Sequence, residues 1–180
     1  PNAYRAMDGQ PGPKYWQQRA DYAINCTLDV VNQRLMGEEV ITYHNESPMP
    51  LTYLWFQLDE NQHDHNSDNN RFDPSSIQPN MDQGSLQGLN RPALLEKYGH
   101  NIESVRDEGD KDLNYVINQT MMRVDLPKAL QPGESFQIKI DWNYYLIDRV
   151  DGPAWGRGGY EYFSDNDNYL FTITQWYPRL

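Results

Sequence analysis

The sequence has a single cysteine, no long apolar run and few basic residues. One cysteine excludes an intrachain disulfide, and 180 residues are enough to bury a core without such a link. Cys26 falls in an alternating apolar pattern, which predicts a small buried thiol rather than a nucleophile. No stretch approaches the roughly 20 apolar residues of a transmembrane helix, so we expect no membrane insertion.

The charge balance is acidic, with 26 Asp and Glu against 15 Lys and Arg and a net charge of −11. Such a chain is repelled by phosphate backbones and anionic lipid surfaces, so nucleic acid and membrane partners are disfavoured. Aromatic residues make up 13% of the chain, and their abundance suits half-buried strands in which a ring packs while its polar edge reaches water.

Period-two alternation of apolar and polar residues predicts the main strands. Ala20 to Val30 and Leu35 to Tyr43 read as a hairpin, and Phe136 to Tyr144 is the clearest amphipathic strand. Leu51 to Leu58 is apolar throughout, which predicts a strand buried on both faces. Further strands are expected at 101–106, 113–117, 121–126 and 169–174, the first two joined as a second hairpin.

Other segments lack this pattern. Asp59 to Gln83 is rich in Asn, Asp, His and Ser and predicts a long surface excursion. Arg91 to Tyr98 predicts a short helix that begins at Pro92. We therefore predict an all-β fold, an antiparallel β-sandwich with long loops and at most one short helix, spanning residues 20–180 after an N-terminal extension at 1–19.

Two groups of residues suggest binding sites. His63 and His65, with His44 as a third ligand, could hold a metal, but no carboxylate or cysteine stands at a structural zinc spacing and no H-E-x-x-H motif occurs. A solvated loop is the alternative, and we expect no structural zinc. Aromatic side chains could instead line a sugar-binding face; these are Trp142, Tyr144, Tyr145, Trp155, Tyr160 and Tyr162. For Trp142 and Tyr144, which continue an apolar stripe, burial in a sheet is the stronger interpretation.

Three stretches carry a resemblance to one family: P-G-P-K-Y-W-Q-Q-R-A-D-Y at 11–22, L-T-Y-L-W-F-Q-L-D-E-N at 51–61 and T-Q-W-Y-P at 174–178. From about Pro11 to Leu180 the chain resembles the amino-terminal domain of aminopeptidase N-like gluzincin zinc metallopeptidases of a bacterial branch. The resemblance implies a saddle-like β-sandwich that precedes a thermolysin-like catalytic domain. That domain would hold zinc through H-E-x-x-H, and this sequence has neither that motif nor G-x-M-E-N.

The resemblance also implies two substrate-binding residues. In the family's T-Q-x-x-P segment the Gln contacts substrate near the first side-chain pocket, and it matches Gln175 here. Many relatives carry Glu or Gln two positions later to anchor the substrate's α-amine, whereas this sequence has Tyr177. A phenol is neutral at pH 7 and cannot supply the charge-assisted bond of a carboxylate.

From the residues alone, the chain is an acidic β-sandwich that binds a ligand or supports another domain, and a carbohydrate- or protein-binding module is the alternative function. The resemblance implies instead a non-catalytic domain with two partners, its own catalytic domain and the peptide substrate. It implies no cofactor in this chain, zinc in the parent enzyme's catalytic domain, and a periplasmic or extracellular location.

Overall fold

The computed structural model describes residues 2–68, 80, 82–83, 94–152 and 156–180. Nine strands lie within these ranges and are ordered along the chain as follows: β1 (Arg19–Asp29), β2 (Arg34–His44), β3 (Leu51–Gln57), β4 (Asn101–Asp107), β5 (Tyr115–Asn118), β6 (Met121–Leu130), β7 (Ser135–Tyr145), β8 (Gly159–Phe163) and β9 (Asn168–Thr172). A 3-10 helix, η1 (Asp59–His63), follows β3 directly.

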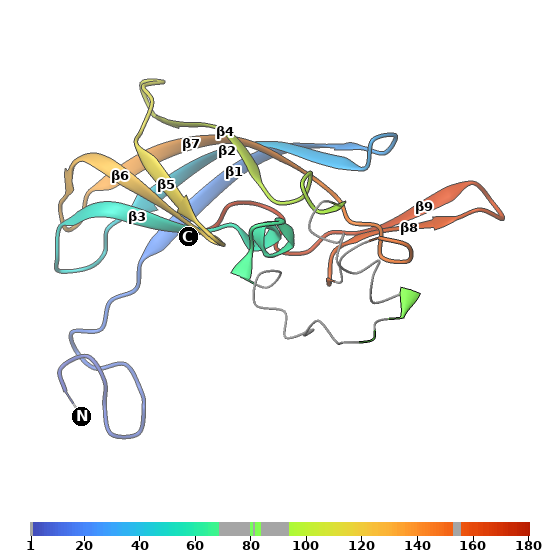
Figure 1. Ribbon diagram of the computed structural model, residues 1–180. Coiled ribbons are helices and arrows are strands. Elements are labelled where there is room, and N and C mark those ends of the chain that lie inside the picture. Colours follow the sequence, from blue (N-terminus) through green and yellow to red (C-terminus); the bar gives the residue numbers. More distant parts are fainter. Residues whose placement is uncertain (1, 69–79, 81, 84–93, 153–155) are drawn as a thin grey trace.

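The strands form three antiparallel sheets with the orders β1-β2-β7-β4, β3-β6-β5 and β8-β9. Figure 1 shows the three-stranded sheet beside the four-stranded one, the hairpin β8–β9 projecting from the far end, and the N-terminal segment leading away from the sheets. The prediction of an all-β fold of antiparallel sheets is confirmed. No helix in the described part of the chain is long and apolar enough to cross a membrane.

One core joins the two larger sheets. Alternate residues of β2 and β7 point into it, among them Ile41, Ile138 and Ile140, and β3 and β6 contribute Phe56 and Met122 from the facing side. The ring of Trp142 on β7 lies across Gly37 on β2, where a Cβ atom would stand 2.3 Å from the ring. Glycine at this position therefore makes room for the largest side chain of the core.

Strand β3 is buried on one face only, so the prediction of burial on both faces is wrong. Leu54 and Phe56 face the core, whereas Tyr53 and Trp55 are 41% and 46% exposed. No sheet covers this outer side in the described residues, and the Arg123 guanidinium stacks on the Tyr53 ring instead.

The predicted hairpin of the strands at 101–106 and 113–117 is also wrong. A tight turn does join them, since Leu113 N donates to Val105 O at 2.9 Å. Beyond that contact the two strands belong to different sheets, because β4 pairs with β7 and β5 pairs with β6. A turn therefore lies between the two strands, but the partner of each strand depends on distant residues.

Cys26 is exposed, contrary to the prediction of a buried thiol. It alternates as expected, but β1 is an edge strand of its sheet, and Cys26 lines a surface cavity there with Met36 and Trp142.

Two predicted segments fall partly outside the described residues. Of the helix predicted at 91–98, residues 91–93 are not described, while Leu95 and Tyr98 pack with Ile147 in a second small core. Of the excursion at 59–83, residues 69–79 and 81 are not described. Its beginning is packed rather than solvated, because Asn61 and His63 of η1 are buried.

Candidate functional site

The segment after β9 returns across the body of the molecule and is fixed beside β3. Gln57 N donates to Arg179 O at 2.7 Å, and Arg179 N donates back to Gln57 O at 3.2 Å. The Arg179 Nε also donates to Asp59 Oδ2 at 3.0 Å. These contacts bring residues 174–180 against η1, although more than a hundred residues separate them in the sequence.

Gln175 is exposed in this segment and has a φ of 52°, in the left-handed region. The strand predicted at 169–174 ends two residues earlier, because β9 ends at Thr172, and Gln175 lies beyond it. The left-handed turn presents Gln175 to a cavity of about 350 Å³. Its lining residues come from η1, from the loop before β8 and from the terminal segment: Asp59, Glu60, Gln62, Gly156, Arg157, Gly158, Thr174 and Gln175.

Tyr177 does not line this cavity. Its half-buried ring packs edge-on against Tyr22 at 5.4 Å and against Trp176 at 5.0 Å between ring centroids. The two residues that the resemblance assigns to substrate therefore lie in different surroundings. The structure places Gln175 at a polar cavity and Tyr177 against aromatic side chains.

Glu60 is the residue of this cavity that sequence reasoning missed. It occupies the first turn of η1, and burial, reinforced by the neighbouring Asp59 carboxylate, raises its pKa to about 7. Its one signal in the sequence was a position near the end of the stretch 51–61 that carries the resemblance. The cavity thus combines a carboxyl group that titrates near neutral pH with an amide that can both donate and accept.

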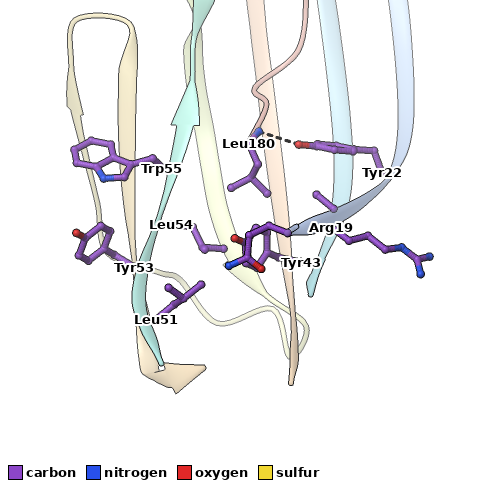
Figure 2. A pocket seen from close by; sticks show the side chains of 10 residues that line it. Arg19, Tyr22, Tyr43, Leu51, Tyr53, Leu54, Trp55 and Leu180 are labelled. Carbon is purple, nitrogen blue, oxygen red and sulfur yellow. Dashed lines mark hydrogen bonds between the residues drawn. The ribbon is translucent and has the colours of Figure 1, made fainter. Parts of the chain in front are cut away.

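A second cavity, of about 560 Å³, lies between β1 and β3 on the other side of the terminal segment. Figure 2 shows Leu54 pointing toward Tyr43 and Leu180, and Tyr53 and Trp55 on the opposite side of β3. The Leu180 N–H donates to the Tyr22 hydroxyl at 2.8 Å. This groove is mainly apolar and brings no catalytic set of side chains together.

The proposed histidine ligands are not brought together as a metal site. His44 Nε2 lies 3.0 Å from Asp21 and its Nδ1 lies 2.7 Å from the Ser135 hydroxyl. His63 is buried in η1 beside Gly156, and His65 lies next to Asp64. Across the described ranges, no group of three His, Cys, Asp or Glu side chains that could hold a metal ion is found.

The predicted aromatic face divides into two parts. Trp142 and Tyr144 are each 1% exposed and belong to the core, as the stripe indicated. Tyr160 and Tyr162 instead join Tyr169 and Phe171 on one face of the hairpin β8–β9, with ring centroids 4.9 to 6.3 Å apart. Trp155 lies outside the described residues.

Comparison with solved structures finds zinc metallopeptidases. A mutant M1 zinc metallopeptidase from Deinococcus radiodurans is 13% identical with a TM-score of 0.44, and the match covers 79% of this chain and 24% of that one. The same enzyme bound to a Tyr-Ser-Ala substrate is 12% identical with a TM-score of 0.45, with 81% of this chain and 26% of that one covered. A two-domain M1 zinc metallopeptidase mutant bound to L-tryptophan is 14% identical with a TM-score of 0.43, covering 79% and 24%.

The chain spans about a quarter of the length of these structures. No protein-family model and no curated protein sequence matches it.

Proposed function

We propose that this chain is a non-catalytic amino-terminal domain of an aminopeptidase-like zinc metallopeptidase. It packs on the catalytic domain and borders that domain's substrate pocket. The observation that carries the proposal is the position of Gln175, the family-matched glutamine, which a left-handed turn exposes at a polar cavity. An amide at such a place can bond an extended peptide backbone through both its donor and its acceptor.

The exposed end of the hairpin β8–β9 is the surface that we assign to the catalytic domain. A two-stranded sheet is marginally stable alone, and its Tyr162, Phe163 and Leu170 are each about half exposed. Burying such side chains against a partner is favourable. Zinc belongs to the catalytic domain in this proposal, and the periplasmic or extracellular location implied by the resemblance is part of it.

Replacing Gln175 in the complete enzyme tests the proposal. Gln175→Ala removes the amide, and Gln175→Gly removes it at a backbone angle that glycine adopts without strain. We expect both to lower kcat/KM for peptide substrates, by an amount that corresponds to about 1–3 kcal/mol of lost transition-state stabilisation. The melting temperature should stay nearly unchanged. Gln10→Ala, an exposed glutamine of the N-terminal segment, is the matched control. Unaltered turnover combined with a large loss of stability would assign Gln175 to structure.

The four neighbouring rings of the hairpin β8–β9, called here the aromatic ladder, are Tyr160, Tyr162, Tyr169 and Phe171. They favour a second candidate, a carbohydrate-binding module, because exposed rings on a sheet can stack on sugars. A sugar-binding module should retain glycan affinity as an isolated domain, whereas a peptidase domain should not. Calorimetry with glycans decides between them. A signal that Tyr162→Ala abolishes would support the carbohydrate candidate.

A further inference from the structure

We propose that Ser135, His44 and Asp21 form a nucleophilic triad that accepts a short acyl group from an activated ester. The proposal goes beyond the proposed function and does not depend on it, because it concerns esters and not peptide bonds. The three residues lie on the four-stranded sheet, away from the Gln175 cavity. The observation that carries the proposal is a chain of hydrogen bonds that crosses three neighbouring strands.

The three side chains belong to β1, β2 and β7, which lie next to one another in the sheet (Figure 1). His44 is directly opposite Ser135 in the pairing of β2 with β7. Asp21 is opposite Thr42, two residues before His44, in the pairing of β1 with β2. Because Tyr43 points into the core, the alternation of the strands puts His44 and the side chains across from it on the opposite, outer face.

The hydrogen bonds of this chain run in a single direction. His44 Nε2 lies 3.0 Å from Asp21 Oδ2, and His44 Nδ1 lies 2.7 Å from Ser135 Oγ. An ionised carboxylate only accepts, so Asp21 assigns the proton of the neutral imidazole to Nε2. Nδ1 is then an acceptor, and the Ser135 hydroxyl donates to it. A hydroxyl bonded to a base that a third group orients is the arrangement that activates a nucleophilic serine.

Asp21 is held in place by a second partner. The Arg19 Nε donates to Asp21 Oδ1 at 3.0 Å, and Nη2 donates to Oδ2 at 2.7 Å. The bond from Arg19, with a smaller effect of His44, lowers the pKa of Asp21, so its carboxylate stays ionised. Asp21 is therefore a positioning residue, which orients the imidazole and does not touch the acyl group. The hydroxyl itself is accessible, because Ser135 is exposed.

The reaction is an acyl transfer from an ester to a hydroxyl. Ser135 Oγ attacks the ester carbonyl while its proton passes to His44 Nδ1, and the Asp21 carboxylate stabilises the imidazolium. The tetrahedral intermediate then breaks its bond to the alcohol, which leaves with the proton from His44, and an acyl-serine remains. Water releases the acid from the acyl-serine by the same two proton transfers.

The neighbours of Ser135 on the outer face indicate which esters fit. Gln137 follows two residues along β7, and Thr42 lies opposite Gln137 on β2. The Gln137 amide can donate to the oxyanion of the tetrahedral intermediate, as side-chain amides do in other acyl-transfer sites. Because both neighbours are polar, the site favours a short acyl group such as acetyl over a long apolar chain.

The test is the reaction of the 180-residue chain with 4-nitrophenyl acetate. We expect an initial burst of 4-nitrophenol, with one acetyl group found on Ser135 by mass spectrometry. Ser135→Ala should abolish the burst, and His44→Gln should slow acylation by about 100-fold, the low end of what a general base contributes. Asp21→Asn should slow acylation at an unchanged melting temperature, and Asp21→Glu should restore part of the rate.

Two matched controls separate the triad from the general reactivity of hydroxyls and imidazoles. Ser104→Ala removes a serine of the same sheet whose hydroxyl donates to Asp141 at 2.6 Å instead of to a histidine. His65→Gln removes an imidazole that lies 3.3 Å from the Asp64 carboxylate in another part of the chain. Both variants should be acylated at the rate of the unaltered protein.

An acetyl group on Ser135 whose formation slows in His44→Gln supports the proposal. An unchanged burst in Ser135→Ala, acetylation at equal rates of Ser135 and of lysine side chains, or the absence of any burst overturns it. None of these outcomes involves peptide hydrolysis. If the complete enzyme cleaved no peptide, the proposed function would fail, and acyl transfer to Ser135 would still be decided by its own measurement.

Discussion

The four-stranded sheet and the hairpin β8–β9 both present a row of aromatic residues on one face, yet they bury these rings very differently. Trp142 and Tyr144 on β7 are each 1% exposed, whereas Tyr162 on β8 is 45% exposed. The alternation along the strands is the same in both. The difference is the facing layer, since β3 and β6 cover the four-stranded sheet and no described element covers the outer half of the hairpin. Burial therefore depends on a second sheet and not on the strand's own pattern.

Several polar groups of the four-stranded sheet are buried without a hydrogen-bond partner in the described residues, whereas polar groups of the hairpin β8–β9 have partners. Both carboxylate oxygens of Glu39, the Trp142 Nε1 and the Tyr144 hydroxyl are buried without a hydrogen-bond partner in the described residues. On the hairpin, the Tyr162 hydroxyl donates to Asp167 at 2.9 Å, and Glu161 pairs with Arg149 at 3.0 Å. The core is therefore where substitutions should have large effects, of either sign.

Trp142→Ala should have the largest effect. Its ring packs on Gly37, His100, Tyr144 and Trp176, and truncating a buried aromatic costs about 3–5 kcal/mol. Urea denaturation measures the loss in the free energy of unfolding, with Tyr162→Ala on the hairpin as the control. Equal losses at the two positions would remove the distinction between the regions.

Glu39→Met should stabilise the same core. Burial raises the pKa of Glu39 to about 9, so the folded state holds a proton that the unfolded chain releases above its ordinary value of 4.5. The contribution of Glu39 to stability is complete below pH 4.5 and is lost as the pH rises through about 9. At pH 7 the free energy of unfolding is lower by about 3 kcal/mol than below pH 4.5. An apolar side chain of similar size avoids this loss.

Melting curves from pH 5 to 9 test this sign. Wild type should lose stability across that window relative to Glu39→Met, while Glu39→Gln should remove the slope but keep a buried amide without a partner. A wild-type protein as stable at pH 9 as at pH 5 relative to Glu39→Met would show that Glu39 has a partner or is hydrated.

The strands of this core could be predicted from sequence because their residues alternate strictly. The hairpin β1–β2 and strand β7 match their predicted ranges to within a residue or two. Strand β8 was missed, since its start lies in a glycine-rich stretch that predicts a loop. Alternation does not encode which distant strands pair, and β4 and β5 therefore join different sheets. It also does not encode which side of a sheet stays uncovered, and Tyr53, Trp55 and Cys26 are exposed for that reason.

The candidate site was predictable only in part for the same reason. Gln175 is predicted from its motif, and its role in substrate binding stays a prediction. Glu60 lines the same cavity because Arg179 pairs with Gln57 and Asp59 across the fold. Tyr177 is only two positions after the motif glutamine, yet beyond the left-handed turn at Gln175 its ring packs against Tyr22 instead of lining the cavity. Local sequence places a residue on an element, and tertiary contacts decide which residues share a site.

His100→Phe tests how the stability of the core depends on acidic pH. His100 lies against Trp142 and Tyr144, and burial lowers its pKa to about 4, against smaller opposing effects of the Trp176 backbone and Asp59. Its contribution to stability is therefore present above pH 6.5 and is lost as the pH falls toward 4. At pH 5 the loss is about 2 kcal/mol relative to pH 7, and the phenylalanine variant should not show it. Parallel acid profiles of the two proteins would contradict a neutral buried imidazole.

Leu170→Ala on β9 should have the smallest effect, within about 0.5 kcal/mol in the isolated domain, because the side chain is already 50% exposed and folding buries little of it. Leu170 lies opposite Glu161, on the face of the hairpin that the aromatic ladder does not occupy. Its truncation therefore leaves Tyr160, Tyr162, Tyr169 and Phe171 in contact. The same urea measurement used for Trp142→Ala checks it. A loss above about 2 kcal/mol would mean that the hairpin is buried by a layer of its own and unfolds with the core. If the loss stays small in this chain but becomes large in the complete enzyme, the missing layer is supplied by the catalytic domain, which is the contact that the proposed function assigns to this surface.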